Sequence, residues 1–263
     1  MKLTIREGQI ALQSLLIMIL ISLFSVIIPI HRIVFIISSC LLTQFFFDLK
    51  FSRKFNYKSS FITSMSLLLL IKTPHYSFDV IASVLAISSK FLIRMDRKHI
   101  FNPANFAIVM LMLFGWAWVT PMQWGQDIWV LLIVTLFGTW LCYKAQRLDV
   151  PLVFLFVTWA LLFHRHVLFL GDPLPIFFHR LSVVSLYVFA FLMISDPKTT
   201  PHRLGARMMW VSMIAIMSFV IENHYFVRHG TLYVLFAFAF FNGLLNKTLP
   251  GKEFVWKDSA ASY

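Results

Sequence analysis

Residues 10–28, which read IALQSLLIMILISLFSVII, decide the class of this protein. The stretch carries no charged side chain, and it is long enough to cross a hydrocarbon core of about 30 Å, which takes about 20 helical residues. Similar apolar stretches recur at 131–143, 152–163 and 181–194, with short polar breaks between them. They are long and continuous, unlike the alternating strands of an outer-membrane barrel. The sequence therefore predicts an all-α polytopic membrane protein.

The composition of the whole chain agrees with that class. Of its 263 residues, 59% are hydrophobic and only 13% are charged, and the mean hydropathy is +0.80. A soluble domain of this length needs more charge to cover its surface. We predict one integral membrane domain, 1–263, with ten transmembrane helices that can be divided into two inverted five-helix halves. The predicted spans are about 10–28, 32–47, 59–72, 77–95, 103–119, 127–143, 150–169, 179–194, 206–221 and 230–246.

The distribution of basic residues predicts an orientation. With the N-terminus placed in the cytoplasm, most of the 23 Lys and Arg residues fall on the cytoplasmic side, as the positive-inside rule requires. The net charge of +12 is therefore a topology signal, and we expect the lipid bilayer and no nucleic acid as a partner. We expect a bacterial inner membrane protein with both termini in the cytoplasm. The basic residues assigned to the outside are Arg32, Lys72, Arg165, Arg180 and Arg228.

A polar motif, Asn102-Pro103-Ala104-Asn105, begins the segment 103–119. Asparagine is a favoured N-cap, and proline fits the first turn of a helix because that turn needs no N–H from it. The free N–H groups of the helix start can bind an anion or a carbonyl oxygen, and Asn105 adds an amide about one turn further in. The motif is either a well-capped helix or half of a ligand site formed by Asn102, Pro103 and Asn105.

A second polar motif, SDPKTTP at 195–201, follows the segment 179–194. Pro197 ends the preceding helix, and Thr200 can cap the approach to the next one. Asp196 either forms a surface salt bridge, which contributes little to stability, or accepts hydrogen bonds from a ligand. Both motifs fall on the predicted cytoplasmic side, where together they would suit a ligand with phosphate or carbonyl groups. The side chains assigned to this half of the site are Asp196, Lys198, Thr199, Thr200 and Arg203.

Neither the cysteines nor the histidines indicate a metal site. Cys40 and Cys142 lie in predicted spans without metal-ligand spacing, which favours a packing role. His164, His166 and His179 fall near the external ends of two spans and could in principle bind a metal. A basic belt that contacts lipid is the interpretation we favour, so no metal ligand is predicted.

Several of these motifs resemble one family. Residues 89–105, together with Gly171-Asp172-Pro173-Leu174 and the motif at 195–201, resemble the D subunit of Rnf electron-transport complexes and the B subunit of sodium-pumping NADH:quinone reductases. The order and spacing of the motifs match over roughly residues 60–248, whereas the N-terminal 55 residues match only in hydropathy. The resemblance implies a ten-helix flavoprotein subunit, built as two inverted halves, that passes electrons together with other redox subunits.

The resemblance also implies a site and a departure from the family. By position, Asn102, Pro103, Asn105, Asp196, Thr199 and Thr200 would line or support a flavin pocket, and Lys198 or Arg203 would compensate charge. The related subunits attach FMN covalently to the threonine of a Ser-Gly-Ala-Thr sequence in an external loop. Here that loop is residues 120–126, and the tetrapeptide occurs nowhere in the chain. We therefore expect FMN or riboflavin to be bound without a covalent link.

The stretch 118–125 and the Asp-Pro-Lys-Thr-Thr-Pro motif are similar to a divergent, stand-alone branch of this superfamily found in secondary-metabolite clusters, including those for enediynes. Two alternatives to electron transport stay open on the same fold. One is a transporter or exporter, and the other is a scaffold subunit that docks a partner. As an enzyme, the chain would be a subunit of an oxidoreductase rather than a catalyst on its own.

Overall fold

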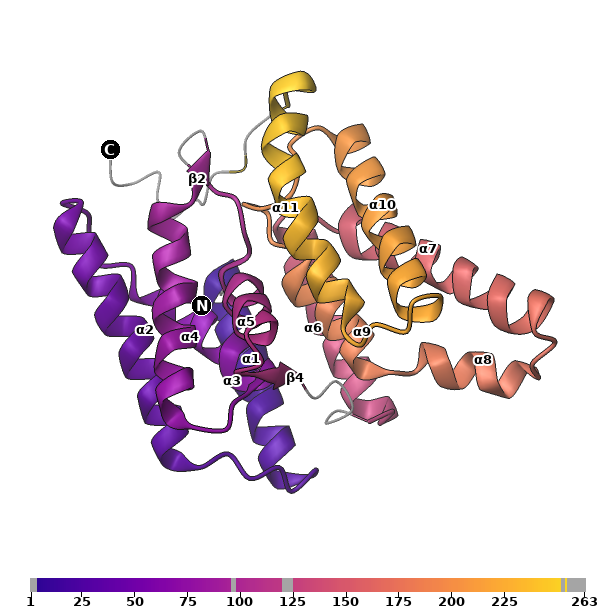
Figure 1. The fold of residues 1–263 in the computed structure, drawn as a ribbon, viewed down its shortest axis with the longest axis horizontal. Helices are drawn as coiled ribbons and strands as arrows, with labels where there is room; N and C mark the ends of the chain where they lie inside the picture. The colour runs from indigo at the N-terminus through magenta and orange to yellow at the C-terminus, as the bar shows by residue number, and fades with distance from the viewer. Residues whose placement is uncertain (1–3, 96–97, 120–124, 252–253, 255–263) are drawn as a thin grey trace.

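The computed structural model describes residues 4–95, 98–119, 125–251 and 254, which form an all-α molecule with a few two-residue strands (Figure 1). The predicted all-α class is confirmed. In chain order the elements are α1 (Ile5–Ser22), α2 (Ile30–Lys50), α3 (Tyr57–Leu70), β1 (Ile71–Lys72), α4 (Tyr76–Leu92), β2 (Arg94–Met95), β3 (Lys98–His99), α5 (Pro103–Leu113), β4 (Trp118–Val119), α6 (Ile128–Lys144), α7 (Asp149–Phe163), the π-helix η2 (His164–Phe169), α8 (Leu174–Leu181), α9 (Val184–Val188), the π-helix η3 (Phe189–Met193), α10 (Leu204–Asn223) and α11 (Gly230–Thr248).

Four of the described helices are long and apolar enough to cross a membrane, namely α1, α2, the continuous helix of α7 and η2, and α10. A fifth candidate span is the pair 174–181 and 184–193, which is bent by 45° at its break. Large apolar side chains also cover much of the outer surface, since Ile27, Phe169 and Trp129 are 86%, 75% and 71% exposed. Such a surface is unfavourable in water and favourable in lipid. The helices and the surface together are those of a membrane-embedded protein.

Each of the ten predicted segments overlaps a helix. In two of the segments, however, the helix is interrupted where the sequence predicted one continuous span. In 103–119, α5 stops at Leu113, and the chain turns through Gly115, whose φ of +70° favours glycine. In 179–194, the first residues belong to α8, and a new helix begins only at Val184. Hydropathy does not detect these breaks because apolar residues continue through both. That all ten segments cross a membrane stays a prediction.

The helices form two groups that lie side by side in Figure 1, α1–α5 and α6–α11. In the first group α2 packs on α4 and α1 on α3, and in the second α7 packs on α10 and α6 on both α9 and η3. The groups meet where α1 contacts α6 and where α5 contacts α11. Gly8 allows the first of these contacts, because a Cβ atom there would lie 2.5 Å from the Trp140 ring.

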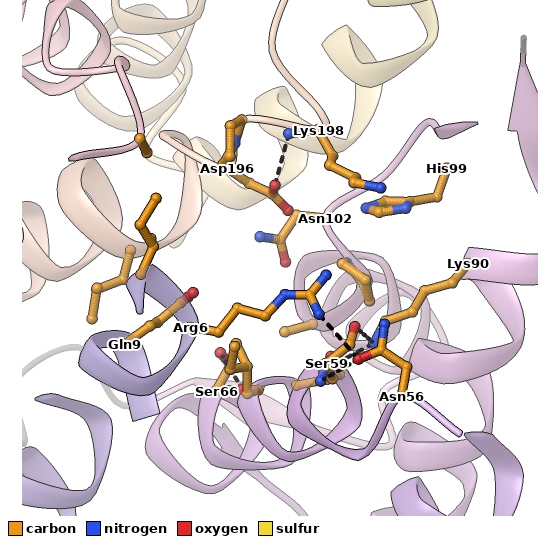
Figure 2. A pocket seen from close by; sticks show the side chains of 18 of the residues that line it. Arg6, Gln9, Asn56, Ser59, Ser66, Lys90, His99, Asn102, Asp196 and Lys198 are labelled. Carbon is orange, nitrogen blue, oxygen red and sulfur yellow. Dashed lines mark hydrogen bonds between the residues drawn. The ribbon is translucent and has the colours of Figure 1, made fainter. Parts of the chain in front are cut away.

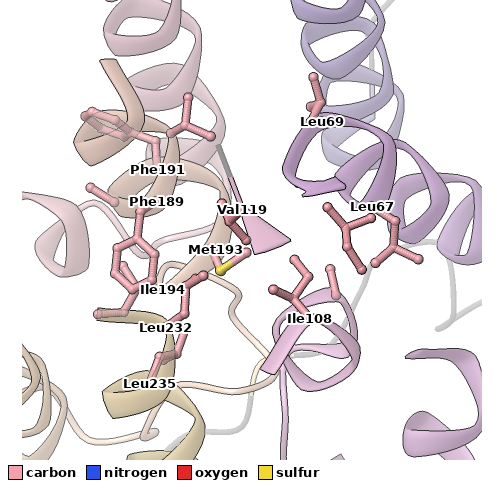
Figure 3. Close-up of a cluster of buried hydrophobic side chains, with 14 of the residues drawn as sticks. Leu67, Leu69, Ile108, Val119, Phe189, Phe191, Met193, Ile194, Leu232 and Leu235 are labelled. Carbon is pink, nitrogen blue, oxygen red and sulfur yellow. The ribbon is translucent and has the colours of Figure 1, made fainter. Parts of the chain in front are cut away.

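Buried apolar side chains from both groups form one core (Figure 3). Leu67 and Ile108 come from the first group, and they lie opposite Phe191 and Leu232 of the second. Within the second group Gly138 of α6 lies against η3, where a Cβ atom would come within 2.6 Å of the Phe191 Cβ. The absence of a side chain at Gly138 therefore sets how closely α6 can approach η3.

The two ends of the molecule are built from different elements. At one end, which we call the basic end, α2 and α4 finish, α3 and α5 begin, and the β2–β3 hairpin joins α4 to α5. Arg53, Lys54 and Arg94 lie there. At the opposite end β1 pairs with β4, and an Arg32 guanidinium nitrogen lies 2.8 Å from the Asp79 carboxylate.

Candidate functional site

A cavity of about 260 Å³ lies at the basic end, and we call it the basic cavity (Figure 2). Its walls come from α1 to α6 and η3, together with the β2–β3 hairpin and the loop 195–198. The volume is close to the lower end of the range for small-molecule sites, which is about 300–1,000 Å³. The cavity therefore has the size of a compact ligand or of one part of a larger ligand.

The basic cavity brings together the starts of the two polar motifs found in the sequence. Asn102 and Pro103 line it from the start of α5, and Asp196 and Lys198 line it from the loop after η3. A direct contact joins the two segments, because Asn102 Nδ2 donates to the carbonyl oxygen of Met193 at 3.3 Å. The first residues of the two motifs thus line one cavity, whereas the start of α10 does not.

Asn102 also has the structural role that its neighbours in sequence predict. It is the N-cap of α5, and its Oδ1 accepts a hydrogen bond from the Asn105 N–H at 3.2 Å. Pro103 follows at the first helical position. Asn102 is therefore both a helix cap and a wall of the cavity, and the two interpretations offered by the sequence are compatible.

The loop 195–201 is held by its own hydrogen bonds. Asp196 Oδ1 accepts from the Lys198 N–H at 3.0 Å, and the Asp196 carbonyl accepts from the Thr199 N–H at 3.1 Å. Burial raises the pKa of the Asp196 carboxyl, while the N–H of Lys198 and the cations of Lys198 and Lys90 act in the opposite direction. The Asp196 carboxyl thus accepts a hydrogen bond from its own loop, and among the ion pairs of the described residues none joins it to Arg203.

The other predicted site residues hold the scaffold and do not line the cavity. Asn105 Nδ2 donates to the Leu232 carbonyl at 3.3 Å, which ties α5 to α11. The Thr199 carbonyl accepts from Asn242 Nδ2 of α11. Thr200 does not cap α10 as the sequence predicted, because its Oγ1 accepts from Arg147 Nε at 3.1 Å and the N-cap is Arg203. Arg203 itself is exposed.

The walls of the cavity are strongly basic. Six cationic side chains line it against two carboxylates, those of Asp48 and Asp196. Asp48 is already engaged, since its Oδ2 accepts from Gln44 Nε2 at 2.8 Å and from the Asn56 N–H at 3.0 Å. An excess of positive charge in a partly enclosed space attracts anions. The cationic residues are Arg6, Arg53, Lys54, Lys90, Arg94 and Lys198.

His99 lines the same cavity from β3, between the cations (Figure 2). Burial, reinforced by Lys90 and Lys198, lowers the pKa of His99 to about 3. The imidazole is therefore neutral at physiological pH and can both donate and accept a hydrogen bond. It adds hydrogen-bonding capacity to the cavity without adding charge.

Sequence reasoning missed the half of the cavity that comes from α1, α3 and α4. Lys90 Nζ donates to the carbonyl and to Oγ of Ser59, both at 3.2 Å. Arg6 Nη1 donates to Asn56 Oδ1 at 3.2 Å. A signal for Lys90 was present, because a lysine inside the apolar segment 77–95 is costly unless it reaches a polar space. Arg6 and Asn56 lie outside the predicted spans, and nothing in the sequence separated them from ordinary interfacial residues.

Within the described residues no group of three or more His, Cys, Asp or Glu side chains could hold a metal ion. Cys40 and Cys142 are both buried and free, and the Cys142 Sγ donates to the Phe191 carbonyl at 3.5 Å. His166, one of the external histidines, pairs with Asp172 at 2.8 Å. In the loop compared with the FMN attachment site, residues 120–124 lie outside the described residues.

No protein-family model matches the chain, and no curated protein matches it either.

Proposed function

We propose that this chain is a membrane electron-transport subunit of the Rnf D and Nqr B type that holds a phosphorylated flavin without a covalent link. The basic cavity carries the proposal, because it joins the two polar motifs to an excess of positive charge. The chain would work as part of an oxidoreductase complex with other redox subunits. A bound flavin would accept and donate electrons there, and the chain's own residues would bind and orient it.

The residues of the cavity are of the kinds that such a cofactor needs, and its volume of about 260 Å³ would hold one part of the cofactor. Phosphate is bound by cations and by N–H groups, and Lys90, Arg94 and Lys198 offer the charge. A flavin ring needs apolar contacts on its faces and amide groups at its edge. Phe91 and Phe191 supply apolar surface for the faces of the ring. The amide side chains at its edge would be those of Gln9, Asn56 and Asn102. Because the sequence has no Ser-Gly-Ala-Thr, the proposal needs no covalent bond.

The directions of the helices support two inverted halves. α1 begins at the basic cavity, where Arg6 lies, whereas α6 ends there, at Leu141 and Cys142. In the same way α3 begins at the cavity, and the α9–η3 segment ends at it. Equivalent helices that run in opposite directions are the property of an inverted repeat. We propose that α1–α5 and α6–α11 are those halves.

We further propose that all ten segments lie in the membrane, although several are short. α3 has 14 residues and would rise only about 21 Å at about 1.5 Å per residue. Seven of its residues are buried, among them Ser60, Thr63 and Ser64, and backbone that protein covers needs no contact with lipid. The basic end would face the cytoplasm of a bacterial inner membrane, with both termini on that side.

Flavin retention after purification tests the proposal. Replacing both Lys90 and Arg94 by glutamine removes two positive charges from the cavity and keeps polar side chains. We expect the flavin-to-protein ratio to fall strongly in this double variant. Lys247→Gln is the matched control, because Lys247 is exposed at the end of α11 and does not line the cavity. Equal flavin content in all three proteins would refute the assignment of the phosphate to this cavity.

A further inference from the structure

A second cavity, of about 1,230 Å³, lies toward the opposite end of the molecule, and we call it the wide cavity. Its walls include the end of α3, β4, the end of α10 and the start of α11. Figure 3 shows part of its apolar lining, with Leu69 on one side and Val119, Phe189, Met193 and Leu232 toward the other. The wide cavity therefore lies between the two groups of helices.

The wide cavity has polar groups that the protein leaves without partners. Gln13 Oε1, Thr158 Oγ1 and Ser218 Oγ are buried atoms of its walls, and none has a hydrogen-bond partner in the described part of the chain. Gln13 and Ser218 are only 1% and 4% exposed. An unpaired buried polar atom costs about 1–3 kcal/mol. In this closed structure no solute in the cavity can touch these atoms, so they become available only when the walls move apart.

The basic and wide cavities lie next to each other inside the protein. Three residues line both of them, namely Ser66, Asn102 and Leu192. At this junction Gln13 Nε2 donates to Ser66 Oγ at 2.8 Å, and Asn102 Nδ2 donates to the Met193 carbonyl at 3.3 Å. The junction thus has two hydrogen bonds between neutral groups, and Met193 belongs to the π-helix η3, a helix type that occurs frequently at functional sites.

The charged residues that line the two cavities favour the binding of an anion over that of a cation. The basic cavity has six cations against two carboxylates, and the wall of the wide cavity adds Arg180 and Arg228. Glu222 also lies there, but its Oε1 already accepts from the N–H and the hydroxyl of Thr231, at 2.8 and 2.7 Å. The junction itself carries no charge and has the amide donors of Gln13 and Asn102, whereas the Ser66 hydroxyl already donates to the Ile62 carbonyl at 3.0 Å. Cationic ends and neutral donors between them select anions over cations.

We propose that the two cavities form one passage for a small hydrophilic anion, closed in this structure by the Gln13–Ser66 and Asn102–Met193 hydrogen bonds. The passage crosses the molecule from the basic end to the opposite end. An anion that enters from the basic cavity exchanges its bound water first for contacts with the cations and then for the amide donors of Gln13 and Asn102 at the junction. This activity goes beyond the proposed function, and because it uses the same basic cavity it belongs to the protein without bound flavin.

Anion flux into vesicles tests the proposal. The full chain is reconstituted into vesicles of phosphatidylethanolamine and phosphatidylglycerol, and valinomycin makes potassium permeable. Swelling is then followed by light scattering in potassium formate, nitrate or gluconate. We expect protein-dependent swelling in formate and nitrate and none in gluconate, which is larger. Ser66→Ala removes the acceptor of the Gln13 hydrogen bond, so its swelling should be faster than that of the unaltered protein.

A thiol block applied to the folded, reconstituted protein tests whether the flux passes through the junction. In a background with Cys40→Ser and Cys142→Ser, Ser66→Cys gives a reactive group where the cavities meet. A bulky neutral methanethiosulfonate added after reconstitution should abolish the protein-dependent flux. Ser22→Cys is the matched control, because Ser22 is exposed at the end of α1 and lines neither cavity. Labelling at that position should leave the flux unchanged.

Three results would overturn the proposal. The first is no anion-dependent swelling in either the folded unaltered protein or Ser66→Ala. The second is equal swelling in gluconate, or swelling in a neutral solute such as glycerol that the thiol block also stops. The third is release of bound flavin, without any flux, when Ser66→Cys is labelled. Flux and flavin content are separate readouts, so a failure of the passage is distinguishable from a failure of the proposed function.

Discussion

Neutralising Lys90 should weaken FMN binding and leave riboflavin binding nearly unchanged, because the two flavins differ only in the phosphate. Lys90 lines the basic cavity, and its Nζ donates to the Ser59 carbonyl and hydroxyl. Glutamine at this position keeps a donor for Ser59 and removes the charge. Lys90→Gln is therefore a test of charge with little change in the local hydrogen bonds.

The expected size of the effect follows from the charge. Two unit charges about 5 Å apart attract by about 3 kcal/mol at an effective dielectric constant of about 20. A hydrogen bond to a charged group contributes about 1.5–3 kcal/mol. The upper end of this range equals the Coulomb energy of about 3 kcal/mol. The dissociation constant for FMN should therefore rise about 10- to 150-fold. The constant for riboflavin should change by less than about threefold, since each 1.4 kcal/mol is about tenfold.

Flavin fluorescence quenching in detergent measures both constants for the unaltered protein, Lys90→Gln and the Lys247→Gln control. The selectivity for FMN over riboflavin should be lost only in Lys90→Gln. An equal loss of affinity for both flavins would mean that Lys90 supports the fold and does not contact phosphate. Unchanged selectivity in Lys90→Gln would refute the placement of the phosphate in the basic cavity.

Three further predictions concern the scaffold. Asp79→Ala should lower the free energy of unfolding by about 3–5 kcal/mol, because it leaves the Arg32 guanidinium without its buried carboxylate; thermal unfolding in detergent measures this, and a shift equal to that of an exposed substitution would contradict it. Gly138→Val should lower the unfolding temperature by forcing α6 away from Phe191, at a cost of about 1–3 kcal/mol, and an unchanged temperature would argue against the close approach. Stability should fall as the pH is lowered from about 6.5 to about 3, because the folded state keeps His99 neutral, with its pKa lowered to about 3, while the unfolded chain takes up a proton. His99→Asn should flatten this part of the pH profile, and an identical profile would show that other groups dominate it.

The helical class and most helix positions were predictable because hydropathy and caps act locally. The capping of α5 by Asn102 is an example, since Asn, Pro and the following apolar run are adjacent in the chain. The stop at Leu113 and the break before Val184 were not predictable from apolar content, which continues through both. The turn after Leu113 passes through Gly115, which is a local signal that apolar content does not register.

The candidate site was predictable only in part. The meeting of Asn102 with the loop after η3 was expected from two motifs assigned to one side of the membrane, and the structure brings them together. The contributions of Arg6 and Asn56 come from helices far away in the chain and have no distinguishing local pattern. Thr200 was misassigned as a cap because its actual partner, Arg147, lies in another loop.

The most direct test of the central claim is the visible absorption spectrum of the purified protein in mild detergent, followed by flavin fluorescence before and after denaturing electrophoresis. Our account predicts a flavin spectrum that is lost from the protein band on denaturation. A colourless, folded protein that binds no added FMN would contradict the account and would favour a transporter or a scaffold subunit. Fluorescence that stays on the band would contradict the absence of a covalent link.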